Sequence, residues 1–453
     1  MSEEKLTWKF SREFWTANGV ELLERAAYYG MFIALTLYLT NLVGFTDIEA
    51  GWIAGLFAAI LYFMPTFSGA WADSMGFRRA LLLAFGLLTI GYGMLGFFAT
   101  KPSTIMALAI IMMGGSFIKS IITGTVAKCS DPTNRARAFS IFYQMVNIGA
   151  FTGKMLAKPL RVELGIQYIN IASACYCLLA LGIVFFLYRN IDTHGMGKNM
   201  KESWAGFVKV LGNLRFMAII IIVGGFWAIQ HQLYATMPKY ILRTVGAGAS
   251  PEWYANVNPL VVVLLVIPIT QLTRKFKPMV SIGIGLFIIP LSALTMSLSP
   301  ILQKTFGNSM PLIGKIFINP ITLVFIIGIA IQALAECFLS PRFLEYASHQ
   351  APPGETGLYM GYAHINSFFG NLLGFGISGY LLNAWCPDPK TLSPQVQSAW
   401  QNALAGQGAM PAAYSHAYYI WYVFAGIGFA TFAVFLLYSF ITNMLDKKRG
   451  VVS

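Results

Sequence analysis

Twelve long apolar stretches, separated by short polar segments, constrain the fold of this chain more than any other feature. A membrane-spanning helix needs about 20 mostly apolar residues, and these stretches have about that length. Hydrophobic residues make up 57% of the 453 residues and charged residues 11%, too few to cover the surface of a soluble protein. The sequence therefore predicts an all-α membrane protein with spans near residues 14–40, 50–71, 79–99, 104–127, 138–158, 167–188, 213–236, 256–273, 279–299, 320–343, 357–383 and 416–443.

Positive charge is distributed unequally over the loops. If the N-terminus is cytoplasmic, the inner loops hold most of the loop Lys and Arg, including Arg78, Arg79, Arg135 and Arg137, and the outer loops hold few. Because positive residues concentrate in cytoplasmic loops, we expect a multi-pass protein of the plasma or inner membrane with both termini in the cytoplasm. The bilayer thus accounts for the net charge of +13. Nucleic acid is excluded as a partner, since no basic run with interleaved aromatic residues occurs.

The longest inner connection follows the sixth apolar stretch and covers residues 189–212. Its Trp204, Phe207, Val208 and Leu211 recur with helical spacing, which predicts an amphipathic helix on the inner leaflet. This linker divides the chain into two bundles of six helices each, at residues 1–188 and 213–453. Two such halves are typical of carriers that alternate access to a site near the middle of the membrane.

A short motif in the inner connection between the second and third apolar stretches supports this interpretation. Gly69-Ala-Trp-Ala-Asp73-Ser-Met-Gly76-Phe-Arg78-Arg79 resembles the G-x-x-x-D-x-x-G-x-x-R signature of the major facilitator superfamily. In such a loop Asp73, Arg78 and Arg79 are expected to pair with neighbouring helix ends and to act as a conformational latch. The resemblance implies the major facilitator fold, with twelve membrane helices in two six-helix bundles.

The first apolar stretch contains charges that do not belong in lipid. Glu21, Arg25 and Tyr29 are spaced by four residues, and Glu24 and Tyr28 lie beside them, so that one helix presents two acids, a base and two phenols. A charge in the middle of the bilayer costs about 2.5–3.5 kcal/mol and usually marks a functional site. The cluster therefore indicates proton transfer coupled to transport, rather than only a static ion pair.

Several motifs resemble those of the proton-dependent oligopeptide transporter family. Glu21-Leu-Leu-Glu24-Arg25-Ala-Ala-Tyr28-Tyr29-Gly30 is similar to its ExxERFxYYG motif, and Phe142-Tyr143-Gln-Met-Val-Asn147-Ile-Gly149 to its FYxxINxG motif. The likeness extends over both halves of the chain, through Phe226-Trp227, Asn258-Pro259, and Glu336 followed by Ser340-Pro341.

The resemblance implies roles for individual residues. Glu21, Glu24 and Arg25 would couple transport to protons, with His231 and Glu336 as further coupling candidates. Arg25 and Lys119 would face a substrate carboxylate, and Asn258 and Glu336 a substrate amino terminus. The remaining expected contacts with substrate are Tyr29, Tyr62, Asn147 and Trp227.

The implied function is a symporter that imports di- or tripeptides together with protons, by alternating access. The alternative is a carrier of another small substrate on the same scaffold: a nitrate-like anion, an amino-acid derivative or a drug-like molecule. An enzyme is not expected, because no nucleophile–base pair or phosphate-binding loop is visible in the sequence. We expect no cofactor and no metal, with protons as the coupling ion and a monomer as the acting unit.

The chain departs from the family pattern at several positions, and two of them, His231 and Lys154, change the expected charges. His231 stands where many peptide transporters have an acid that pairs with the lysine of helix four, here Lys119. It either titrates itself or lines the pathway as a hydrogen-bonding residue. Lys154 is an additional charge in the fifth apolar stretch, and we expect its ammonium to extend outward to the membrane surface.

Overall fold

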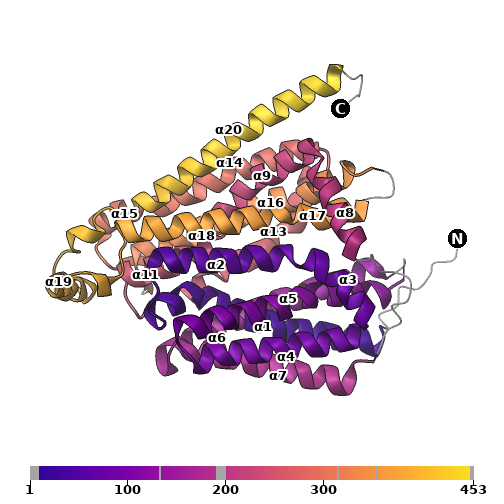
Figure 1. The fold of residues 1–453 in the computed structure, drawn as a ribbon. Helices are drawn as coiled ribbons and strands as arrows, with labels where there is room; N and C mark the ends of the chain where they lie inside the picture. Colours follow the sequence, from indigo (N-terminus) through magenta and orange to yellow (C-terminus); the bar gives the residue numbers. More distant parts are fainter. Residues whose placement is uncertain (1–9, 132–133, 190–199, 314–315, 353–355, 449–453) are drawn as a thin grey trace. The chain divides into compact units, whose positions relative to one another are not determined.

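The computed structural model describes residues 10–131, 134–189, 200–313, 316–352 and 356–448, and it is almost entirely helical (Figure 1). These residues form two compact units. Unit 1 comprises residues 1–44 and 60–206, and unit 2 comprises residues 45–59 and 207–453. The chain thus passes twice between the units near its start, because residues 45–59 lie with the C-terminal part.

Unit 1 is a bundle in which α1 packs against α6 and α7, and α4 packs against α5 and α7. A π-helical turn, Leu160–Leu164, follows α6. The helices of unit 1 are α1 (Arg12–Asn41), the last residues of α2 (Asp47–Phe63), α3 (Pro65–Met75), α4 (Phe77–Phe97), α5 (Lys101–Lys128), α6 (Arg135–Pro159), α7 (Gln167–Leu187) and the first part of α8 (Met200–Leu211).

Unit 2 is built around α16, which packs against α13 and α14, while α9 packs against α18 and α20. An antiparallel pair, β1 (Met310–Ile313) and β2 (Ile316–Ile318), precedes α16. The helices after α8 are α9 (Leu214–Gln230), α10 (Gln232–Ala235), α11 (Met237–Thr244), α12 (Pro251–Tyr254), α13 (Val257–Thr273), α14 (Pro278–Ser297), α15 (Ser299–Phe306), α16 (Pro320–His349), α17 (Thr356–Ala363), α18 (Ile365–Trp385), α19 (Pro394–Leu404) and α20 (Tyr419–Lys448), with short 3-10 turns at Pro389–Thr391 and Ala412–Tyr414.

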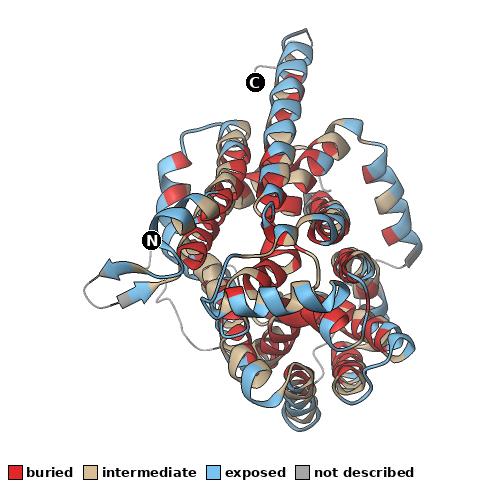
Figure 2. Cartoon of the chain, turned by 90° about the vertical axis from the view of Figure 1, so that its left-hand side faces the viewer, coloured by how far each residue is buried: buried red, intermediate tan, exposed pale blue. Residues whose placement is uncertain are grey.

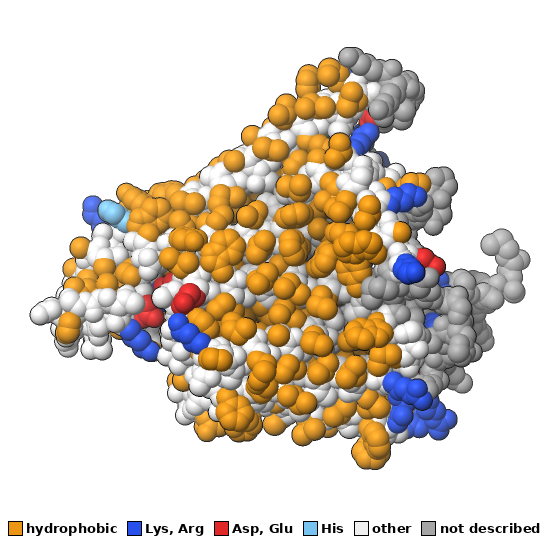
Figure 3. Space-filling view, in the orientation of Figure 1, with side chains coloured by type: hydrophobic (Ala, Val, Ile, Leu, Met, Phe, Trp, Pro, Cys, Tyr) orange, Lys and Arg blue, Asp and Glu red, His pale blue; other side chains and the backbone are white. Residues whose placement is uncertain are grey.

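Each of the twelve predicted spans coincides with one helix or with two consecutive helices. Within the described residues, eight helices are long and apolar enough to cross a membrane by length and composition alone. The helices α1, α2, α6 and α18 are outside this group. Figure 3 shows hydrophobic side chains spread along the flanks of the helices, and charged ones mainly near the helix ends. The all-α membrane fold expected from the sequence is confirmed.

Glycine allows α1 and α6 to approach closely. A Cβ atom at Gly153 would lie 2.2 Å from the carbonyl oxygen of Ala26, and one at Gly149 would lie 2.4 Å from that of Leu22. Helices normally pack 8–10 Å apart, at a distance set by the side chains between them. Because glycine has no side chain, Gly149 and Gly153 allow α6 to lie unusually close to α1, the helix that contains the charged cluster. Figure 2 shows that many of the helices carry both buried and exposed residues.

The linker helix α8 (Met200–Leu211) lies within the predicted connection. Trp204 and Val208 are exposed. The Trp204 ring contacts Phe67 within unit 1, and the Phe207 ring contacts Tyr362 within unit 2. Residues 190–199 lie outside the described residues. The division of the chain into two bundles at residues 189–212 stays a prediction.

Candidate transport site

The charged cluster of α1 forms one compact ion-paired group in unit 1. An Arg25 terminal nitrogen lies 2.5 Å from Glu24 Oε2, and Arg25 Nε lies 3.3 Å from Glu21 Oε1. Both glutamates are only 2% exposed. Glu21 Oε2 has no hydrogen-bond partner among the described residues. The two acids thus share one base, so that protonating either one releases Arg25 from part of its pairing.

Tyrosine rings lie next to Arg25 and also next to Lys119. The guanidinium of Arg25 lies 5.4 Å from the centre of the Tyr28 ring. Tyr29 meets Tyr28 edge to face, with the ring centres 5.2 Å apart. The Lys119 ammonium lies 5.5 Å from the centre of the Tyr62 ring, and the Lys119 side chain is exposed. Such contacts stabilise a cation where it has lost some of its water.

The remaining predicted residue of unit 1, Asn147, is only partly buried. Its Nδ2 donates a hydrogen bond to the carbonyl oxygen of Tyr143, 2.8 Å away on the same helix. Unit 1 therefore contains Glu21, Glu24, Arg25, Tyr29, Tyr62, Lys119 and Asn147. Their assigned roles stay predictions.

Lys154 does not extend outward as expected. It is 1% exposed, and its ammonium lies 5.8 Å from the centre of the Tyr29 ring. The expectation was wrong because it assumed a free outer flank for α6. Lys154 instead follows Gly153, where α6 and α1 nearly touch, and its ammonium lies near Tyr29 of α1.

Unit 2 brings Asn258 and Glu336 together. Glu336 Oε2 accepts hydrogen bonds from Asn258 Nδ2 at 3.2 Å and from Gln230 Nε2 at 2.9 Å. The sequence analysis did not select Gln230. The available signal was an amide three residues after Trp227, on the same face of an otherwise apolar helix.

Trp227 and His231, which flank Gln230 in sequence, stack on each other, with ring centres 5.3 Å apart and planes 29° apart. His231 is 7% exposed, and its Nδ1 has no hydrogen-bond partner among the described residues. Lys119, the expected counterpart of the usual acid at this position, belongs to unit 1. Whether His231 titrates during transport stays a prediction.

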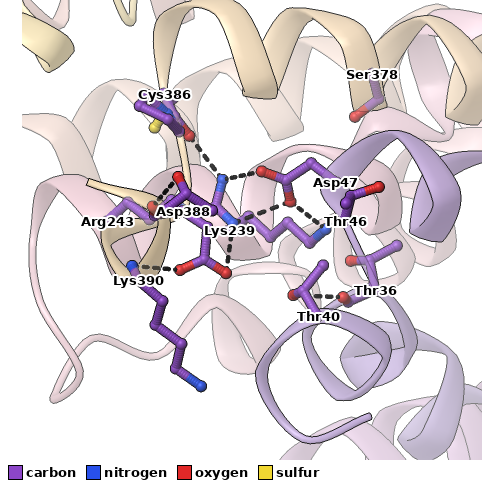
Figure 4. A network of polar contacts seen from close by, with 12 residues as sticks. Thr36, Thr40, Thr46, Asp47, Lys239, Arg243, Ser378, Cys386, Asp388 and Lys390 are labelled. Atoms are coloured by element: carbon purple, nitrogen blue, oxygen red, sulfur yellow. Dashed lines mark hydrogen bonds and ion pairs between the residues drawn. The ribbon is translucent and has the colours of Figure 1, made fainter. Parts of the chain in front are cut away.

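A second ion cluster, which the sequence analysis missed, lies around Asp47 at the start of α2 (Figure 4). Asp47 Oδ1 lies 2.7 Å from Lys239 Nζ, and its Oδ2 lies 2.7 Å from an Arg243 terminal nitrogen. Arg243 also donates to the carbonyl oxygen of Cys386 at 2.6 Å and lies 3.8 Å from Asp388 Oδ2. Opposite charges 192 and 196 residues apart in sequence gave no local signal for this contact.

The cluster attaches several connecting segments of unit 2 to α11. The indole nitrogen of Trp400 on α19 donates to the carbonyl oxygen of Arg243 at 2.8 Å. Burial raises the pKa of the Cys386 thiol to about 12, so this residue contributes its carbonyl oxygen and not a thiolate. Gly51 and Gly55 place the first part of α2 directly against α18. Residues 45–59 are thus held in unit 2 by both charge and close packing.

We expect Asp47→Asn to destabilise unit 2 strongly. The substitution leaves Lys239 and Arg243 buried without their counter-charge, and breaking a buried ion pair in this way costs about 3–5 kcal/mol. Thermal unfolding of the purified protein in detergent measures the effect. Asp388→Asn is the matched control, because Asp388 lies farther from Arg243 and is more exposed, and its expected cost is below about 1 kcal/mol. Equal effects of the two substitutions would contradict this ranking.

The predicted latch is only partly described. Arg78 Nε donates to the carbonyl oxygen of Tyr188 at 2.9 Å, and one of its terminal nitrogens donates to that of Phe185 at 2.7 Å. Arg78 therefore contacts the end of α7, as expected of a residue that pairs with a helix end. Arg79 is exposed, and the side chain of Asp73 lies outside the description. The latch role stays a prediction.

Comparison with known proteins places the chain in a family. The family model described as Major Facilitator Superfamily matches residues 20–314, more than half of the chain. A multidrug resistance protein MdtH from Photorhabdus laumondii is 23% identical over 80% of this chain and 84% of its own length. A dipeptide and tripeptide permease B from Photorhabdus asymbiotica is 32% identical, but over 38% of this chain and 36% of the permease.

Solved structures show the same fold. The POT family transporter PepTSo superposes with a TM-score of 0.72 at 18% identity, covering 96% of this chain and 99% of that one. A POT family transporter in complex with 5-aminolevulinic acid gives 0.70 at 18% identity, covering 98% and 97%. The chain therefore belongs to the Major Facilitator Superfamily, and the resemblance to the proton-dependent oligopeptide transporters predicted from its sequence is confirmed.

Proposed function

We propose that this membrane transporter is a symporter that imports di- and tripeptides together with protons, by alternating access. The proposal places the chain in the cell membrane as a monomer with both termini in the cytoplasm. The observation that carries it is the α1 cluster, in which two buried glutamates share Arg25. A proton taken up by one glutamate changes the net charge of this group, and its release restores the ion pairs.

The cargo is assigned from the charges in the two units. Arg25 and Lys119 of unit 1 are cations suited to a substrate carboxylate. Glu336 of unit 2, with two amide donors on one of its oxygens, is suited to an amino terminus. A peptide carries both groups at fixed ends and varies in its side chains. The dipeptide and tripeptide permease relative supports this substrate class.

A second candidate, transport of drug-like molecules, is favoured by the MdtH relative, which aligns with most of the chain. His231 favours it as well, because the acid usual at this position in peptide transporters is absent. Glu336 separates the two candidates. A buried carboxylate has an evident role for a substrate with an ammonium group and little role for a neutral compound or a simple anion.

Uptake into liposomes tests the proposed function. Purified protein is reconstituted, an inward proton gradient is imposed, and accumulation of a labelled dipeptide is followed. We expect concentrative uptake that a protonophore abolishes, and competition by dipeptides and tripeptides but not by free amino acids or nitrate. Uptake that is unchanged by the protonophore would refute proton coupling. Competition by drug-like molecules alone would favour the second candidate.

A further inference from the structure

One turn at the end of α9 contains three polar atoms that are buried and unpartnered among the described residues. They are Trp227 Nε1, Gln230 Oε1 and His231 Nδ1. The three residues stand at positions i, i+3 and i+4, so they share one face of the helix. Leaving a buried polar atom unpaired costs about 1–3 kcal/mol. Three such atoms on one turn leave hydrogen-bonding capacity that is available to a ligand.

The contact with Glu336 determines how the Gln230 side chain is oriented. An ionised carboxylate accepts hydrogen bonds and donates none, so the Gln230 amide nitrogen must be the atom that faces Glu336 Oε2, 2.9 Å away. Gln230 Oε1 is therefore an open acceptor on a side chain that is only 4% exposed. The hydrogen bond to Glu336 thus holds Gln230 Oε1 close to the carboxylate.

Among the described residues, Glu336 has one oxygen without a hydrogen bond, Oε1, for the three N–H donors of an ammonium group. Its Oε2 already receives two amide N–H groups, from Gln230 and Asn258, while an ammonium group brings three N–H donors. Gln230 Oε1 is a second acceptor next to the acid. On the same face, the indole N–H of Trp227 is an open donor, and a donor requires an acceptor from the ligand.

We propose that Gln230 is a specificity-determining residue that contacts the substrate and, with Glu336, binds a free α-amino terminus. Trp227 Nε1 then donates to the carbonyl oxygen of the same substrate residue. The ligand class is an α-ammonium carbonyl compound, in which the nitrogen and the carbonyl group are attached to one carbon. An N-acylated peptide lacks the ammonium group and loses both the charge and two of its three donors. This inference rests on the proposed function and adds a residue and a chemical requirement to it.

A role of Gln230 in helix packing alone, with Glu336 left in place, makes a different prediction. Loss of a structural contact weakens the binding of every ligand alike. Loss of an acceptor for the ammonium group weakens binding only of ligands that carry this group. The ratio of two affinities therefore separates the two roles, and it is insensitive to a uniform loss of active protein.

The experiment measures how dialanine and N-acetyl-dialanine inhibit counterflow of a labelled dipeptide in liposomes containing the full-length protein. The variant is Gln230→Met, which has a similar volume and no amide. Gln332→Met is the matched control. Gln332 is 1% exposed, also has an unpartnered Oε1, and lies one turn before Glu336 on α16, but its Nε2 faces the carbonyl oxygen of Ile229 at 3.5 Å.

We expect the wild-type protein to prefer dialanine, and Gln230→Met to reduce this preference about tenfold, the typical effect of one hydrogen bond to a charged group. Gln332→Met should leave the preference unchanged. An unchanged preference in Gln230→Met, or an equal reduction in both variants, would overturn the role of Gln230 while leaving peptide transport intact. Wild-type protein that transports no dipeptide would overturn both the proposed function and this inference.

Discussion

Replacing Glu24 with glutamine is expected to abolish accumulation of dipeptide driven by a proton gradient. Glutamine preserves the volume of this 2% exposed side chain and can still accept a hydrogen bond from Arg25. It cannot bind or release a proton, and it does not neutralise the guanidinium 2.5 Å away. Arg25 then remains paired with Glu21 alone, at 3.3 Å. The coupling step is lost, although the shape of the site is retained.

Two assays distinguish loss of coupling from loss of the protein. Gradient-driven uptake by Glu24→Gln should fall to the level of empty liposomes, whereas exchange of labelled for unlabelled dipeptide at equal pH should continue, because it needs no net proton movement. Glu163→Gln is the control, since Glu163 is exposed in the π-helical turn after α6 and its loss should change neither assay. Normal accumulation by Glu24→Gln would show that this acid does not couple transport to protons.

The second large effect is expected at the contact between α1 and α6. A methyl group at residue 153 would lie 2.2 Å from the carbonyl oxygen and 2.9 Å from the Cα atom of Ala26. These are backbone atoms, so no rotamer change relieves the clash and the helices must separate. We expect Gly153→Ala to reduce stability by about 3 kcal/mol or more, at the upper end for overpacking.

A comparison with Gly182 isolates the cause. Nothing lies within 4 Å of a Cβ at Gly182 on α7, and Gly→Ala in a helix without a clash stabilises by about 0.4–1 kcal/mol. Thermal melting in detergent and the yield of monodisperse protein should therefore fall for Gly153→Ala and hold or rise for Gly182→Ala. Similar melting temperatures of the two variants would mean that α1 and α6 tolerate a wider separation.

Most of the fold was predictable because lipid imposes a simple rule. Backbone polar groups in a bilayer must be satisfied within their own helix, so long apolar stretches identify the spans. The α1 cluster was predictable for a different reason: the charged side chains of Glu21, Glu24 and Arg25 are costly inside a bilayer, so they stand out in an apolar stretch. The convergence of Asn258 and Glu336 followed from the family resemblance.

The features that were missed depend on the packing of distant segments. Asp47 reads as an ordinary acid near a helix start, and Arg243 as an ordinary charge in a loop. Only the fold brings them to 2.7 Å. The prediction for Lys154 was wrong because a long side chain near a helix end often reaches the membrane surface. The close contact between α1 and α6, at which Lys154 is buried, depends on glycines whose role the sequence pattern does not reveal. Gln230 was overlooked because the sequence analysis selected mainly charged residues and histidines within the apolar stretches.

The helix α2 belongs to both units, since residues up to Ala59 lie in unit 2 and residues from Ile60 lie in unit 1. The helical stretch breaks at Met64, and the next residue, Pro65, has no N–H to offer the preceding turn. A helical stretch bends most easily where a backbone hydrogen bond is missing. The stretch from Asp47 to Met75 therefore bends most easily around Met64 and Pro65, close in sequence to the boundary between the two units at Ala59 and Ile60.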